Sequence, residues 1–98
     1  MYESKLKSKE LDDLFAAILS LKTVEECYML FDDLCTVSEL NAIGQRFKVA
    51  NMLSGKSTCN AIAKKTGAST ATISRVNRCL NYGSGGYNLV IERNAKSE

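Results

Sequence analysis

The 98-residue chain has no histidine and no proline. Histidine is the side chain most often used for proton transfer near neutral pH. No acidic pair falls where the pattern predicts a cleft, and the stretch Gly83-Ser84-Gly85-Gly86 lacks the strand and the lysine of a phosphate-binding loop. The sequence therefore predicts a protein that is not an enzyme.

Closely spaced cysteine pairs are also missing. Cys27, Cys35, Cys59 and Cys79 form no C-x-x-C pair, whereas zinc sites need ligands close together in the chain. We expect no metal and no cofactor. The spacing favours free thiols, buried in a protein of a reducing compartment, over disulfides.

Long apolar stretches are absent as well. The longest uncharged apolar run, residues 15–21, is far shorter than a membrane span. The first ten residues mix lysine with glutamate and have no apolar signal-peptide core. These features predict a cytoplasmic protein without a membrane partner.

Acidic residues are missing from the whole stretch between Leu40 and Ile91. Residues 1–43 carry four basic and nine acidic side chains, a net charge of −5, whereas residues 44–98 carry nine basic and two acidic ones, a net charge of +7. The positive charges of the carboxylate-free stretch are Arg46, Lys48, Lys56, Lys64, Lys65, Arg75 and Arg78. This balance suits a polyanionic partner such as nucleic acid.

The N-terminal half is predicted to be helical. Ser8 begins a helix whose apolar residues recur at helical spacing. Thr23 to Glu26 and Thr36 to Glu39 have the pattern of capping boxes, and the second of these helices is expected to end at Gly55, a typical C′ residue. The apolar faces expected to be buried hold Leu11, Leu14, Phe15 and Ile18, then Val24, Cys27, Tyr28, Phe31 and Leu34, and then Leu40, Ile43, Phe47 and Ala50.

Residues 57–82 predict two short helices joined by a tight turn. Ala63 is small enough for a steep helix crossing, and Gly67 suits a turn that needs a positive φ. Ser69 caps the second helix, and Ile73 fills the angle between the two helices. The neighbours expected around Ile73 are Ile62, Ala68 and Val76.

The outer face of the second short helix is expected to hold Thr70, Ala71, Ser74 and Arg78. These side chains are small, polar or basic, and none is acidic. Such a helix fits the major groove of DNA, where Ser and Thr contact base edges or phosphates. The pattern therefore predicts a DNA-binding helix-turn-helix, with a helical hairpin that binds nothing as the alternative.

The end of the chain leaves its secondary structure open. Tyr87, Leu89 and Ile91 alternate as in a strand, but a short helix over residues 87–93 fits an all-helical chain better. Residues 94–98 are expected to form a frayed tail.

Four short stretches match a known family. They are Ala42-Ile43-Gly44-x-Arg46-x-Lys48, then Gly55, then residues 67–75 in part, and finally residues 80–87. On these stretches the chain resembles the tryptophan repressor superfamily, and over nearly its whole length its YerC/YecD family. The resemblance implies a single all-α, Trp-repressor-like domain over residues 1–98 that forms an intertwined dimer. Its parts would be the dimerisation helices (1–54), the helix-turn-helix (55–82) and a C-terminal segment (83–98).

The resemblance also implies particular site residues. The family's DNA contacts correspond to Asn60, Thr70, Ala71, Thr72 and Ser74, with Lys64 and Lys65 nearby. The two arginines that hold tryptophan in the repressor correspond to Arg46 and Arg75. At the repressor's next glycine this chain has Val76, and at a serine that helps hold the ligand it has Cys79.

These departures predict that free tryptophan binds weakly or not at all, because Val76 places two methyl groups where a flat ring would lie. Arg46 and Arg75 contact either a ligand or, equally well, phosphates or acidic side chains of the first half. The function predicted is a sequence-specific transcriptional repressor that binds near-palindromic operators as a homodimer. A helical protein–protein interaction module is the alternative.

Overall fold

The computed structural model describes residues 2–96, and within that range the chain forms six α-helices and no strand, as an all-α protein should. The helices are α1 (Lys9–Leu19), α2 (Val24–Leu34), α3 (Val37–Ser54), α4 (Cys59–Thr66), α5 (Thr70–Tyr82) and α6 (Gly86–Lys96). None of the described helices combines the length and the apolar character needed to cross a bilayer. The chain divides into two compact units, one ending at Val37 and the other beginning at Ser38.

The first unit holds α1 and α2, and both begin where the sequence predicts. The Ser8 hydroxyl accepts a hydrogen bond from the Leu11 N–H at 3.1 Å. The Thr23 hydroxyl accepts one from the Glu26 N–H at 3.0 Å, and the Glu26 carboxylate reaches back to the Lys22 N–H at 2.8 Å. Each cap satisfies N–H groups that a helix start leaves without an intrahelical partner.

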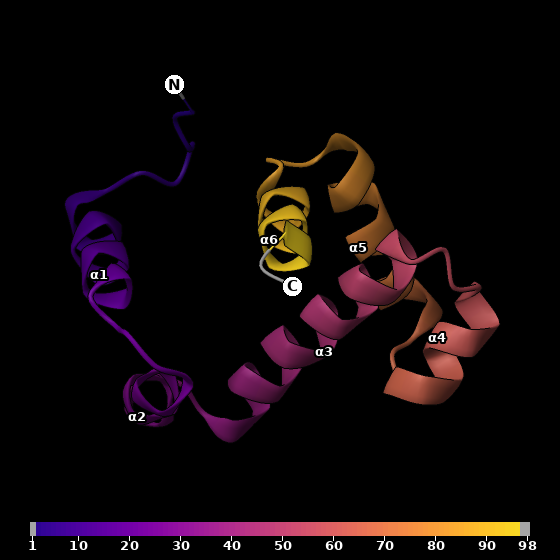
Figure 1. The fold of residues 1–98 in the computed structure, drawn as a ribbon, viewed down its shortest axis with the longest axis horizontal. Coiled ribbons are helices and arrows are strands. Elements are labelled where there is room, and N and C mark those ends of the chain that lie inside the picture. Colours follow the sequence, from indigo (N-terminus) through magenta and orange to yellow (C-terminus); the bar gives the residue numbers. More distant parts are fainter. Residues whose placement is uncertain (1, 97–98) are drawn as a thin grey trace. The chain divides into compact units, whose positions relative to one another are not determined.

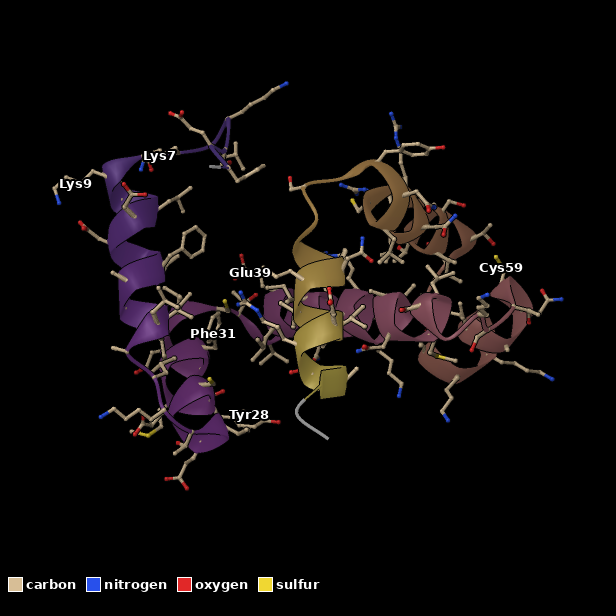
Figure 2. The ribbon with its side chains drawn as sticks, turned by 45° about the horizontal axis from the view of Figure 1, so that its top comes forward. Lys7, Lys9, Tyr28, Phe31, Glu39 and Cys59 are labelled. Carbon is tan, nitrogen blue, oxygen red and sulfur yellow. The ribbon has the colours of Figure 1, made fainter. Side chains whose placement is uncertain are left out.

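Burial in α1 and α2 differs from the prediction, because neither helix buries a single residue in the protomer. Val24 is 74% exposed and Tyr28 is 62% exposed, and Tyr28 extends away from its helix (Figure 2). Phe31 is only half-buried. Two helices of 11 residues each are too small to enclose large side chains between them.

The second unit contains the core of the protomer. Its buried residues are Val49, Ala50, Ile62, Ala68, Ile73 and Val76. They come from α3, α4, the turn after α4, and α5, which meet at the C-terminal end of α3 (Figure 1). The residues expected around Ile73 are therefore all present in the core.

The segment left open by the sequence is helical. Tyr87 and Ile91 lie four residues apart on α6 and pack against the core, while Leu89 remains 48% exposed. The apparent strand alternation arose because Leu89 is apolar but faces away from this core. The helix continues through residues 94–96 of the predicted tail, and residues 97 and 98 lie outside the described residues.

Candidate nucleic-acid interface

The turn between α4 and α5 has the geometry that its sequence predicts. Gly67 adopts φ +73°, and its N–H donates to the Ala63 carbonyl at 2.9 Å. The Thr66 hydroxyl donates to the Ile62 carbonyl at 2.7 Å and accepts from the Ala68 N–H at 3.1 Å. The turn is therefore fixed by its own hydrogen bonds, with glycine at the position where a side chain would be strained.

The start of α5 is capped by Ser69. Its hydroxyl accepts from the Thr72 N–H at 3.1 Å and donates to the Thr72 hydroxyl at 3.1 Å. Thr72 is also half-buried, unlike its neighbours Thr70 and Ala71. Thr72 therefore has a clear structural task in the helix start, whereas the side chains of Thr70 and Ala71 face solvent.

The two faces of α5 differ sharply. Ile73 and Val76 are each 2% exposed and hold the helix against the core. The opposite face carries no carboxylate, and its exposed residues are Ala71, Ser74, Arg75, Arg78 and Tyr82. The helix thus presents small, polar and cationic groups to solvent along its 13 residues.

The remaining predicted DNA-contacting residues lie on α4. Asn60, Lys64 and Lys65 are all exposed. Lys64 and Lys65 also lie in the last turn of the helix, where positive charge interacts favourably with the helix dipole. Two roles are therefore compatible with these lysines, and they do not exclude each other.

The positive charges of this surface are not paired within the protomer. In the part of the chain that the structure describes, both ion pairs join residues near the N-terminus, Lys7 with Asp12 and Lys9 with Asp13. Arg46, Arg75 and Arg78 contact no described carboxylate. An unpaired cationic surface is what electrostatic attraction of a polyanion requires.

The four predicted pocket residues have different surroundings. Arg46 is exposed on α3 and Arg75 is exposed on α5, whereas Val76 belongs to the core. Cys79 is exposed and borders a shallow hollow of about 480 Å³. The other residues that line this hollow are Phe47, Ser84, Gly85, Gly86, Tyr87 and Val90.

The thiols are less buried than the sequence predicts. Cys27, Cys59 and Cys79 are exposed and Cys35 is half-buried, and all four are free. Cys59, the first residue of α4, projects from the ribbon into solvent (Figure 2). The prediction of buried thiols is therefore wrong for the isolated protomer, because three of these cysteines lie outside its single core.

Sequence reasoning missed two interactions that position the motif. The Gln45 side chain donates to the Thr66 carbonyl at 3.1 Å, and the Asn88 side chain donates to the Leu80 carbonyl at 2.9 Å. No local pattern announces a bond between residues 21 positions apart. The amide of Asn88, directly after a glycine-rich turn, is a residue type that often bonds nearby backbone.

The left-handed residue after α3 was also misplaced. The sequence assigns the C′ position to Gly55, but the positive φ of +65° belongs to Lys56. The Lys56 N–H bonds to the Leu53 carbonyl and the Ser57 N–H to the Met52 carbonyl, both at 2.9 Å. These are the two bonds of a Schellman motif with Lys56 at C′. The helix therefore ends one residue later than a glycine-based rule predicts.

Comparison with known proteins gives consistent matches over nearly the whole chain. The family model described as Trp repressor protein matches residues 9–95. The protein YerC of Bacillus subtilis (strain 168), itself uncharacterised, is 54% identical over 98 residues, which cover 100% of this chain and 94% of YerC.

Two crystal structures are also similar. A TrpR-like protein from Eubacterium eligens ATCC 27750 has a TM-score of 0.89 and 56% identity, covering 93% of this chain and 94% of its own. A candidate Trp repressor from Staphylococcus aureus has a TM-score of 0.87 and 49% identity, covering 91% of this chain and 89% of its own.

Proposed function

Because the chain belongs to the Trp repressor family, we propose that it is a transcriptional regulator that binds double-stranded DNA through α4 and α5. The observation that best supports this is the outer face of α5, where Ala71, Ser74 and Arg78 are exposed. The apolar side of the same helix is fixed in the core by Ile73 and Val76. A helix held in this way, with small and cationic groups outward, suits insertion into the major groove.

The residues of the motif divide between two tasks in this proposal. Thr70, Ala71 and Ser74, near the start of α5, contact base edges and provide sequence preference. Thr72 adds to this indirectly, since its hydroxyl is bound to Ser69 at 3.1 Å. The residues assigned to the DNA backbone are Asn60, Lys64, Lys65 and Arg78, which orient the motif on the duplex.

We propose that the active species is a homodimer. Neither α1 nor α2 buries a residue in the protomer, although Leu19 is 84% exposed and Val24 is 74% exposed. Exposed apolar side chains of this number need a cover, and a second copy supplies it in an intertwined arrangement. Two motifs related by a two-fold axis then match near-palindromic sites with half-sites about 34 Å apart, or a multiple of that distance.

Repression without tryptophan is the mode of action that we propose. A dimer that occupies an operator in the cytoplasm excludes other proteins from the same DNA. The motif is competent alone or is tuned by a ligand other than tryptophan, because the chain has Val76 where the repressor has glycine. Arg46 and Arg75 are then free to contact phosphates.

The test is fluorescence polarisation with duplex DNA over a range of salt concentrations, together with light scattering. We expect a species of twice 10.8 kDa and DNA binding that weakens steeply as salt rises, because phosphate contacts release counterions. Ser74→Ala and Thr70→Ala should change sequence preference, whereas Lys64→Ala should weaken all duplexes alike. A folded monomer without salt-dependent DNA binding would favour a protein–protein interaction module. Genomic footprinting then identifies the operator.

A further inference from the structure

The turn between α3 and α4 holds an unusual residue. Lys56 is the one non-glycine residue with a positive φ, +65°, in the range 2–96 that the structure describes. The left-handed region suits glycine, because the Cβ of any other residue comes close to its own backbone there. A lysine at this position therefore costs stability that glycine would not.

The neighbouring glycine does not remove this cost. Gly55 precedes Lys56 but is not the left-handed residue. A Cβ added at Gly55 would meet the carbonyl oxygens of Asn51 and Met52 at 3.5 and 3.6 Å, which is ordinary contact. Stability alone would thus favour glycine at position 56 rather than at position 55, so the lysine side chain must offset the strain in another way.

The charge of Lys56 has no partner in the described part of the protomer. Its side chain is exposed, and no acidic residue occurs between Leu40 and Ile91. Lys56 also lies two residues before Thr58, whose hydroxyl caps α4. The first helix of a helix-turn-helix crosses the DNA backbone, so Lys56 is placed beside the motif element that approaches phosphates.

We propose that Lys56 contacts a DNA phosphate and that the duplex-binding surface extends from α4 and α5 to the α3–α4 turn. The inference rests on the DNA-binding function proposed above and adds a residue to it. The competing explanation is purely local: a positive charge at the C-terminal end of α3 interacts favourably with that helix's dipole. The local explanation predicts no effect on DNA.

The test uses Lys56→Gly, which removes the charge and the strain together. We expect this variant to be more resistant to urea than the wild-type protein, so that misfolding does not obscure the result. Its affinity for a mixed-sequence duplex should be lower than that of the wild type, and the salt slope should fall by about one. Because each lost phosphate contact removes a slope of about 0.9, the ratio of the two affinities should shrink about 3.5-fold between 50 and 200 mM salt.

Two further variants serve as controls. Lys56→Arg keeps the charge and should keep the wild-type salt slope. Lys22→Gly removes one exposed lysine from the α1–α2 connection and should bind as the wild type does, which separates a local contact from a change in net charge. An unchanged salt slope for Lys56→Gly would overturn the inference while leaving the DNA-binding function intact. A wild-type protein that binds no duplex would overturn both.

Discussion

The side-chain amide of Gln45, on α3, donates a hydrogen bond of 3.1 Å to the carbonyl of Thr66, the last residue of α4. The last carbonyls of a helix have no partner within the helix. Gln45 satisfies one of them and at the same time joins α3 to the turn that sets the angle between α4 and α5. The position of the motif on α3 therefore depends on a polar contact as well as on the apolar core.

Replacing Gln45 by alanine should lower the free energy of unfolding by about 0.5–1.5 kcal/mol, the usual net contribution of one hydrogen bond. Glutamine and alanine are both good helix formers, so helix propensity offsets little of the loss. Urea titration measures the effect. The control is Asn51→Ala on the same helix, since the Asn51 side chain bonds only the Phe47 carbonyl of its own helix. Equal stability of the two variants would contradict the anchoring role of Gln45.

The glycine-rich turn before α6 gives a second matched pair of variants. A Cβ at Gly83 would lie 2.5 Å from the Cys79 carbonyl oxygen, whereas a Cβ at Gly86 would meet nothing within 4 Å. Gly83→Ala should therefore destabilise the protein by about 1–3 kcal/mol, while Gly86→Ala should be neutral or slightly stabilising. Thermal unfolding of the two variants distinguishes them. A tolerated Gly83→Ala would show that the turn relaxes without loosening α6.

Thiol accessibility tests the proposed dimer. Cys27 and Cys59 are both exposed in the protomer, but Cys27 lies four residues before Phe31 and seven before Leu34, on the apolar face of α2. A second copy that covers this face should protect Cys27 from a maleimide, while Cys59 at the start of α4 stays reactive. Mass spectrometry of the native protein gives both rates. Similar rates in the native protein would argue against a cover over α2.

Tryptophan is expected to bind weakly or not at all. Calorimetry with L-tryptophan should show no micromolar binding, and the DNA affinity should not change when tryptophan is added. Micromolar binding that also tightens the DNA complex would contradict this prediction. Val76→Gly is a poor rescue variant, because Val76 is 2% exposed in the core, and its removal should cost at least about 2 kcal/mol in lost packing and helix propensity.

Local rules predicted the features that depend on a few neighbouring residues. The caps at Ser8, Thr23 and Ser69 were all predictable, because a hydroxyl and the N–H group that it accepts from lie within three residues. The turn at Gly67 was predictable for the same reason. The Ile73 core followed from side-chain spacing along two helices that are adjacent in the sequence.

Features that depend on distant residues were missed or misjudged. The Gln45 bond spans 21 positions, and no periodic pattern encodes it. The apolar face of α2 was predicted correctly as a face, but its burial was not, since burial depends on what covers the face. At Lys56 the preference of glycine for a left-handed C′ position misled the prediction by one residue, because a stability rule does not include a charge kept for another purpose.

The six buried residues all lie between positions 49 and 76, so the order of α3, α4 and α5 depends on contacts inside one chain. The order of α1 and α2, in the proposed dimer, depends on meeting a second chain. Newly synthesised copies that have not yet paired would therefore expose a loosely held N-terminal third to cellular proteases. Degradation would remove unpaired chains faster than paired ones, so the cell would adjust the supply of this regulator by the survival time of single copies.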